Sequence, residues 1–233
     1  MKLATPSAED LPLYPSTSFR RPRVIKHPRV RMVRPTYCRS KRVMDVTVCL
    51  LLMPVALPIM AICAALIWLA DPGPILFRQR RPGRGGVPYP MLKFRTMVKN
   101  AKDLEKDLAH LNELTWPDFK ITNDPRVTRI GKFLRKTSLD ELPQLFNVLR
   151  GEMSLVGPRP TCFGVAEYAV SQTERLEVLP GITGLWQVSG RSDLDLADKL
   201  RLDSQYIEQQ SVWLDVKILW WTVPAVLMSR GAY

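Results

Sequence analysis

The sequence predicts an α+β, mainly helical fold: a monotopic membrane protein with a kinked, re-entrant membrane helix near its N-terminus and a cytosolic domain that contains a small β-hairpin. Three patterns support this prediction. Residues 46–70 form an uncharged run. Residues 75–81 and 89–97 have the composition of two short strands on either side of a glycine-rich loop, which is typical of a hairpin. The remaining segments follow mostly helical periodicity.

The first 40 residues contain several prolines and many arginines without a sustained apolar period, so we expect a basic, disordered arm. Residues 20–42 carry ten Lys and Arg and no acid, and the whole chain has a formal net charge of +12. Such an excess of positive charge indicates an anionic partner: nucleic acid, anionic lipid or a phosphorylated substrate. The apolar run that follows the arm favours anionic membrane lipid.

The membrane helix is expected over residues 41–71. Its uncharged core of 25 residues is long enough to cross a bilayer and lacks the pattern of a secretory signal. Pro54 and Pro58 lie one turn apart in its middle, where each would bend a helix. Positive charge marks the cytoplasmic side of a membrane segment, yet both flanks are positive here, with Lys41 and Arg42 before the run and Arg78, Arg80, Arg81 and Arg84 after it. These features favour a re-entrant helix over the alternative, a single spanning helix.

Histidine and cysteine offer little chemistry in this chain. The two histidines, His27 and His110, are far apart, and the four cysteines show no CxxC spacing. A histidine-built metal site and a Ser-His-Asp triad are therefore disfavoured, and a reduced, cytosol-facing protein is expected. We therefore expect any catalysis to depend on carboxylates, arginine, lysine and a hard cation. Because no glycine-rich phosphate loop is present, we expect side chains to bind phosphate.

The strongest candidate site is the adjacent carboxylate pair Asp140 and Glu141, which precedes a short apolar helix and has basic residues on both sides. The alternative is a helix cap, because Ser138 and Glu141 have the spacing of a capping box. Pro143 argues against that alternative. With Ser138 as the cap, Pro143 would fall at the fifth helical position, where its ring and its missing N–H are unfavourable. With Asp140 as the cap, Pro143 would fall at the third helical position and could offer the cap no N–H.

Several basic residues are candidates for binding phosphate. Lys93 and Arg95 share one face of the second strand, although two exposed sheet charges would have the same spacing. Arg135 belongs to an amphipathic helix expected over residues 127–135. Arg159 lies in the stiff Gly-Pro-Arg-Pro loop of residues 157–160, where its planar fork suits bidentate phosphate recognition or simply decorates a turn. Arg191 ends a glycine-punctuated segment that either approaches a ligand closely or only forms turns.

The cytosolic domain is expected to extend over residues 72–233. Its other helices are predicted at residues 98–114, which are polar, and at 165–178, 196–209 and 213–228. The last of these carries Trp213, Trp220 and Trp221. These side chains suit either a membrane interface, which would make the C-terminal helices interfacial, or the protein core.

Five motifs together identify a family resemblance. In order, they are Lys41-Arg-Val-Met-Asp45, Lys93-Phe-Arg-Thr-Met97, Ser138-Leu-Asp-Glu-Leu-Pro-Gln-Leu145, Gly157-Pro-Arg-Pro160 and Pro180-Gly-Ile-Thr-Gly184. Over residues 39–233 the chain resembles the bacterial monotopic phosphoglycosyl transferases, especially the undecaprenyl-phosphate galactose or glucose phosphotransferases of exopolysaccharide synthesis. It looks like the minimal form of that family. It departs from the family at the helix break, where Leu57-Pro58 stands in place of the usual Ser-Pro pair.

The resemblance implies a Mg²⁺-dependent enzyme at the cytoplasmic face of the bacterial inner membrane. Such an enzyme transfers a hexose 1-phosphate from a UDP-hexose to undecaprenyl phosphate and releases UMP. By this likeness Asp140 is the nucleophile that forms an aspartyl phospho-sugar ester, and Glu141, together with Asp140, holds Mg²⁺. The phosphate-binding candidates are Lys93, Arg95, Arg135, Arg159 and Arg191.

Two other functions compete with the transferase: a membrane-tethered nucleic-acid binder and a non-catalytic scaffold of a polysaccharide export complex. Against the first, no helix-turn-helix, zinc or base-stacking signature is present, so we expect no nucleic-acid partner. The second leaves Asp140 and Glu141 without a role. The sequence leaves open the sugar, galactose or glucose, and the oligomeric state, including a homodimer.

Overall fold

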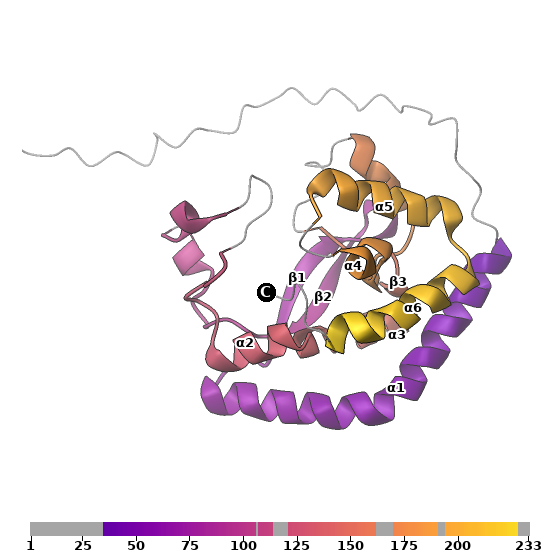
Figure 1. Ribbon diagram of the computed structural model, residues 1–233. Helices are drawn as coiled ribbons and strands as arrows, with labels where there is room; N and C mark the ends of the chain where they lie inside the picture. The colour runs from indigo at the N-terminus through magenta and orange to yellow at the C-terminus, as the bar shows by residue number, and fades with distance from the viewer. Residues whose placement is uncertain (1–34, 106, 114–120, 162–169, 191–193, 228–233) are drawn as a thin grey trace, which may run out of the picture. The chain divides into compact units, whose positions relative to one another are not determined.

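The computed structural model describes residues 35–105, 107–113, 121–161, 170–190 and 194–227 (Figure 1). Two compact units divide the chain, Met1–Met32 and Val33–Tyr233, and every described residue belongs to the second. The expected basic arm therefore lies almost entirely outside the described residues, and so does Arg191.

The N-terminal helix α1, Pro35–Ala70, is the longest element, with 36 residues. It begins before residue 41, where the membrane segment was expected to start. Among the described helices, α1 is the one that is long and apolar enough to cross a membrane. Pro54 and Pro58 lie inside it, and Figure 1 shows that its axis changes direction partway along. A proline in a helix interior removes a hydrogen bond and bends the axis. The bend is thus explained by the sequence, while the re-entrant topology stays a prediction.

The expected hairpin is confirmed. Strands β1, Leu76–Pro82, and β2, Pro88–Phe94, pair antiparallel, with Phe77 opposite Lys93. The connection contains the short 3-10 turn Arg84–Gly86. Strand β2 ends earlier than expected, and Met97 beyond it forms an isolated bridge with Val127. This bridge leads the chain from the hairpin to the next helix.

A second, parallel pair of strands is present that the sequence did not predict. Strand β3, Ser154–Val156, pairs with β4, Gly181–Thr183. Each strand has three residues, too few to show an alternating pattern of apolar side chains. The two backbones approach closely at Gly157 and Gly181, because a Cβ atom on Gly181 would lie 2.2 Å from the Gly157 nitrogen. The Gly-Pro-Arg-Pro loop thus leaves the end of β3 at a fixed position.

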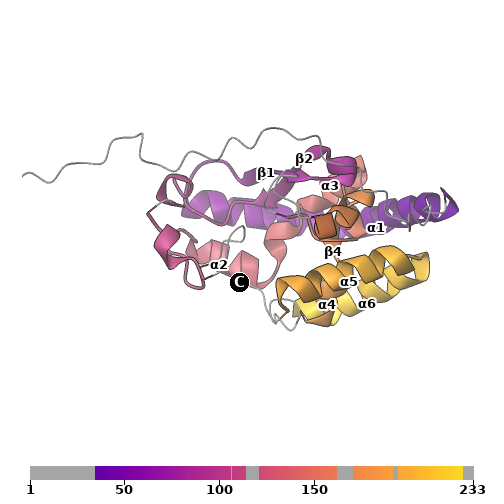
Figure 2. The ribbon, with the colours of Figure 1, turned by 90° about the horizontal axis from the view of Figure 1, so that it is seen from above.

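Four of the expected helices form: α2, Arg129–Lys136, α3, Gln144–Arg150, α5, Leu196–Gln209, and α6, Val212–Leu227. A further short helix, α4, Leu185–Ser189, lies in the glycine-punctuated segment, where no helix was predicted. Thr128 caps α2, accepting a hydrogen bond from the Gly131 N–H. Figures 1 and 2 together show α4, α5 and α6 on one side of α3 and the hairpin on the other.

The predicted helix over residues 98–114 is wrong. The described part of this segment contains only two 3-10 turns, Asp103–Glu105 and Ala109–Leu111. A polar segment without an apolar stripe has no face to bury, and helices of this length are marginal without packing. The predicted helix over residues 165–178 lies partly outside the described residues, and the described part, Val170–Glu177, is a 3-10 helix.

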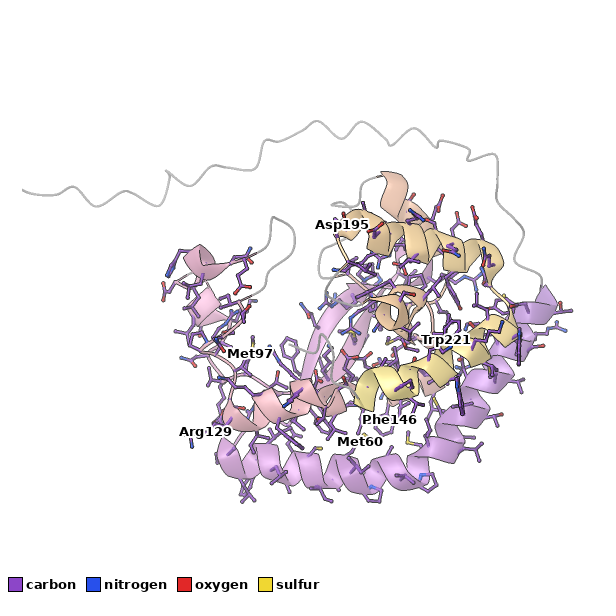
Figure 3. All side chains as sticks on the ribbon, in the orientation of Figure 1. Met60, Met97, Arg129, Phe146, Asp195 and Trp221 are labelled. Atoms are coloured by element: carbon purple, nitrogen blue, oxygen red, sulfur yellow. The ribbon has the colours of Figure 1, made fainter. Side chains whose placement is uncertain are left out.

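One face of α1 is buried in the protein core and the other is exposed. Cys49, Ala56, Met60, Cys63 and Ile67 recur at helical spacing, and all are buried. Met60 and Phe146 of α3, both labelled in Figure 3, belong to the same apolar cluster. The opposite face exposes large apolar side chains: Val43, Leu50, Leu51, Leu52, Val55, Leu57, Ile62, Leu66, Trp68 and Leu69. An apolar surface of this extent on a soluble domain would be unusual.

Polar contacts fasten the first turns of α1 to the rest of the unit. The buried carboxylate of Asp215 on α6 accepts hydrogen bonds from Lys41 Nζ and Tyr37 Oη, both at 2.9 Å, and from Tyr206 Oη at 2.7 Å. Asp45, also buried, accepts hydrogen bonds from Ser154 Oγ at 2.8 Å and the Leu155 N–H at 3.1 Å. Helix α1 is thereby tied both to α6 and to β3.

Arg42 makes a third attachment, at the C-terminal end of α3. Its guanidinium donates to the carbonyl oxygens of Val148 and Leu149. The last carbonyls of a helix have no partner within the helix and carry partial negative charge, so an arginine there is favourable. Lys41 and Arg42, which the sequence analysis expected at the flank of a membrane segment, therefore also make contacts within the folded unit.

Gly131 sets how closely α2 packs, and we predict that Gly131→Ala is destabilising. A Cβ atom at this position would lie 2.0 Å from the carbonyl oxygen of Thr96. Inserting an atom into such a contact costs about 1–3 kcal/mol, whereas Gly→Ala at an open helix position would stabilise by up to about 1 kcal/mol.

The measurement is the midpoint of thermal or denaturant unfolding, with Lys132→Ala as the control because Lys132 is the exposed neighbour on the same helix. A Gly131→Ala protein as stable as the control would contradict the close packing of α2 against Thr96.

Candidate active site

Asp140 and Glu141 lie in a tight turn between α2 and α3. The turn is the 3-10 segment Leu139–Glu141, and Ser138 before it has a φ angle of 58°. This left-handed conformation is uncommon for a residue other than glycine, and among the described non-glycine residues Ser138 alone has a positive φ. Pro143 follows as the residue that precedes α3. The chain thus reverses sharply and places both carboxylates just before the apolar helix.

The capping alternative for this segment is wrong. The Ser138 side chain makes no cap hydrogen bond, and the carboxylate of Glu141 bonds to side chains rather than to the backbone of the turn. The positive φ angle of Ser138 explains the failure, since an N-cap residue normally has an extended backbone.

Glu141 is held between two basic residues from different parts of the chain. Lys93 Nζ on β2 donates to Glu141 Oε1 at 2.8 Å. Arg159 grips the same carboxylate with both terminal nitrogens, one of them 3.2 Å from Oε2. Burial acts to raise the pKa of Glu141, but the charges of Arg159 and Lys93 outweigh it and hold this pKa well below its usual range. Glu141 is therefore a permanently charged anchor at neutral pH.

Asp140 has a different environment although it is the next residue. It is 8% exposed, its Oδ2 atom lies 4.0 Å from Lys93 Nζ, and no hydrogen bond to its carboxylate is found among the described residues. Burial raises the pKa of Asp140; Lys93 opposes this and the negative charge of Glu141 adds to it. A desolvated carboxylate without a committed partner is free to react or to bind a ligand.

The other sequence candidates lie at varying distances from this pair. The positive charge of Arg135 on α2 acts on Asp140, and its Nε atom is fixed by Thr96 Oγ1 at 3.0 Å. Arg95 instead contacts Asp71 after the end of α1, by an ion pair of 3.5 Å to Oδ2 and a hydrogen bond to the backbone oxygen. The structure thus brings Lys93 and Arg159 into contact with the carboxylate pair, leaves Arg135 bound to Thr96 with its charge acting on Asp140, and holds Arg95 at Asp71.

Comparison with known proteins decides the family. The family model described as bacterial sugar transferase matches residues 36–229. The chain belongs to this family. It is 49% identical over 70% of its length to the galactosyl transferase CpsE of Streptococcus agalactiae, and 40% identical over 86% to the exopolysaccharide production protein ExoY of Rhizobium meliloti. It is 42% identical over 83% to the UDP-glucose:undecaprenyl-phosphate glucose-1-phosphate transferase of Caulobacter vibrioides. The matches cover 36% of CpsE, 91% of ExoY and 72% of the Caulobacter protein.

In this bacterial sugar transferase, Asn147 is a site-building residue that sequence reasoning missed. Its side chain is fully buried on α3, accepts the Leu92 N–H at 3.0 Å and donates to the Pro90 carbonyl at 2.9 Å. Asn147 thereby fixes the backbone of β2 one residue before Lys93. The available signal was a single polar residue within the apolar run of α3, since a buried asparagine requires partners.

The carboxylate pair is compatible with a magnesium ion only if a substrate shares it. No group of three or more His, Cys, Asp or Glu that could hold a metal is found in the described part of the chain. Mg²⁺ commonly takes one or two protein carboxylates and completes its shell with water and substrate phosphates. Asp140, whose carboxylate is uncommitted, and Glu141 fit such a shared site, with Lys93 and Arg159 competing for Glu141.

Proposed function

We propose that this protein transfers a hexose 1-phosphate from a UDP-hexose to undecaprenyl phosphate, as the first membrane step of exopolysaccharide synthesis. The observation that carries the proposal is the uncommitted, buried carboxylate of Asp140 beside Glu141, which two cations hold. The names of the Caulobacter and Rhizobium relatives agree with the donor, the acceptor and the pathway class. The name of CpsE points to galactose and that of the Caulobacter protein to glucose, so a panel of UDP-sugars must identify the hexose.

The first half-reaction forms a covalent intermediate. An oxygen of the Asp140 carboxylate attacks the phosphorus that carries the sugar, the bond from this phosphorus to the bridging oxygen breaks, and UMP leaves with that oxygen. Repulsion between two phosphate anions makes direct attack by the lipid phosphate difficult, and a carboxylate intermediate divides the transfer into two easier steps. Lys93, Arg135 and Arg159 are placed to offset the charge of the diphosphate.

The second half-reaction regenerates the enzyme. An oxygen of undecaprenyl phosphate attacks the same phosphorus, the aspartyl bond breaks, and Asp140 returns to its carboxylate form as undecaprenyl-diphosphate-hexose is released. A magnesium ion held by Asp140, Glu141 and the substrate would neutralise phosphate charge and favour departure of UMP. The role of Glu141 and its two cations is to keep this site fixed through both steps.

The membrane arrangement that we propose is re-entrant, with both ends of α1 on the cytoplasmic face of the inner membrane. Lys41, Arg42 and Asp45 attach the start of α1 to the folded unit, and Asp71 attaches its end to Arg95 and Lys99. A straight helix of 36 residues would be about 54 Å long, whereas the hydrocarbon core of a bilayer is about 30 Å thick. A bent helix with both ends on one folded unit fits a single leaflet better. The exposed Trp213 and Trp220 of α6 suit the adjoining interface.

Substitution of Asp140 tests the nucleophile. We expect Asp140→Asn to retain the fold and to lose activity by at least about 10³-fold, because an amide cannot attack phosphorus. With labelled UDP-hexose and no lipid acceptor, the wild-type protein should retain sugar phosphate and release UMP, and the variant should do neither.

Asp195→Asn is the matched control for this experiment. Asp195 caps α5, with its Oδ1 atom accepting the Asp198 N–H at 2.7 Å, and asparagine caps about as well as aspartate. Near-normal turnover of Asp140→Asn would eliminate Asp140 as the nucleophile.

Removal of divalent cations should abolish UMP release, since no glycine-rich phosphate loop is present and the two adjacent carboxylates add negative charge beside a bound diphosphate, which a metal ion would offset. Turnover is measured in excess chelator and again after Mg²⁺ is restored. Glu141→Gln should raise the Mg²⁺ concentration needed for half-maximal rate. Full turnover in chelator would refute the metal requirement.

Labelling of engineered cysteines tests the topology. In a protein with its native cysteines replaced by serine, Ser40→Cys and Arg80→Cys place thiols at exposed positions on either side of the apolar segment. Both should react with an impermeant reagent added from the cytoplasmic side only. Leu57→Cys, in the exposed face of α1, should be protected by lipid. Reaction of the two flanking thiols from opposite sides would establish a spanning helix instead.

A further inference from the structure

Arg159 is fixed at its backbone as well as at its side chain. Its guanidinium grips Glu141, and its carbonyl oxygen accepts a hydrogen bond from Arg175 Nη2 at 2.7 Å. Pro158 and Pro160 on either side have restricted φ angles and no N–H groups. The contact from Arg175 is therefore a charge-assisted hydrogen bond to a loop that has few backbone donors of its own.

Arg175 is in turn held by a buried acid from α5. Its Nε atom lies 2.9 Å from Oδ2 of Asp203, and the two side chains are 10% and 1% exposed. Burial outweighs the opposing charge of Arg175 and raises the pKa of Asp203 to about 6. The desolvation of a buried ion pair often exceeds its mutual attraction. This pair is thus poorly explained as a source of stability. Its hydrogen bond to the carbonyl of Arg159 indicates a role at the site instead.

We propose that Asp203 and Arg175 form a positioning pair, which fixes the carbonyl of Arg159 and so directs its guanidinium toward Glu141. Asp203 orients Arg175, and Arg175 orients the loop. No hydrogen bond or ion pair links either residue to Asp140 or Glu141 in the described part of the chain, so both act through Arg159. The turnover test of this pair rests on the proposed transferase function, but its structural test does not.

The competing explanation is that the Asp203–Arg175 ion pair only holds α5 against the 3-10 helix Val170–Glu177. A second contact between the same elements allows the two explanations to be separated. Ser204 Oγ donates to Glu174 Oε2 at 2.9 Å, one residue along the chain from Asp203 and Arg175. Only the Asp203–Arg175 contact continues to Arg159. Ser204→Ala is therefore a matched control, because it weakens the attachment of α5 to the 3-10 helix and leaves the positioning pair intact.

The structural test is hydrogen–deuterium exchange of the full chain in membrane mimetic. In Asp203→Asn, the amides of Gly157, Arg159 and Thr161 should exchange about tenfold faster or more, as expected when a charge-assisted hydrogen bond is lost. Ser204→Ala should leave them unchanged. If Asp203→Asn fails to fold, Arg175→Lys replaces it, because lysine retains the charge opposite Asp203 but lacks the second nitrogen that reaches Arg159. Equal exchange in the variant and the wild type would overturn the proposal.

The turnover test is a double-mutant cycle with UMP release as the readout. Asp203→Asn should lower the single-turnover rate constant of UMP release about tenfold in the wild-type background and cause no further loss in an Arg159→Ala background. If Asp203→Asn lowered the rate by the same factor in both backgrounds, or if Ser204→Ala lowered it as much as Asp203→Asn, the effect would be a general structural one and the proposal would be overturned. If wild-type protein releases no UMP from any UDP-hexose, the proposed function fails, while the exchange experiment still decides whether the pair positions the loop.

Discussion

The carboxylate of Glu141 is the contact on which the geometry of the site depends. It joins three segments that are far apart in the sequence: β2 through Lys93, the turn before α3, and the loop after β3 through Arg159. Each of these segments is stiffened separately, by Asn147 behind β2, by Pro143 in the turn and by two prolines in the loop. A charged carboxylate with two partly buried cationic partners is strongly directional, so the neighbouring Asp140 is held in place without needing hydrogen bonds of its own.

Helix α3 connects this site to the long apolar helix α1. Its N-terminal end follows the carboxylate turn, its middle residue Asn147 holds β2, and its C-terminal carbonyls accept Arg42 of α1. Asp45 of α1 also reaches β3, which leads directly into the loop of Arg159. In the membrane arrangement proposed above, the depth of α1 in lipid would therefore set the position of the site relative to the membrane surface, which suits the proposed lipid-borne phosphate acceptor.

The sequence predicted the features that depend on local pattern. The long uncharged run predicted α1, and two segments of strand-like composition around a glycine-rich loop predicted the hairpin. The helical spacing of apolar residues predicted α2, α5 and α6. It failed where long-range contacts decide. The pair of three-residue strands forms only because distant backbones meet at Gly157 and Gly181. Likewise, the spacing of Lys93 and Arg95 predicted one shared strand face, but β2 ends at Phe94. Lys93 contacts Glu141 and Arg95 contacts Asp71, a difference that spacing alone does not reveal.

Adjacent carboxylates in one basic setting acquire opposite properties here, and the reason is geometric. Glu141 has the longer side chain and meets Lys93 and Arg159 directly, so its pKa falls despite burial. Asp140 is shorter, stays 4.0 Å from Lys93, and keeps the burial that raises its pKa. When their environments shift the pKa values of two neighbouring titratable groups in opposite directions, the two groups commonly have different chemical roles. Exchanging the two acids, by Asp140→Glu together with Glu141→Asp, would therefore not be conservative. The shorter acid at position 141 would lose its grip on Arg159, while the longer acid at position 140 would compete for Lys93.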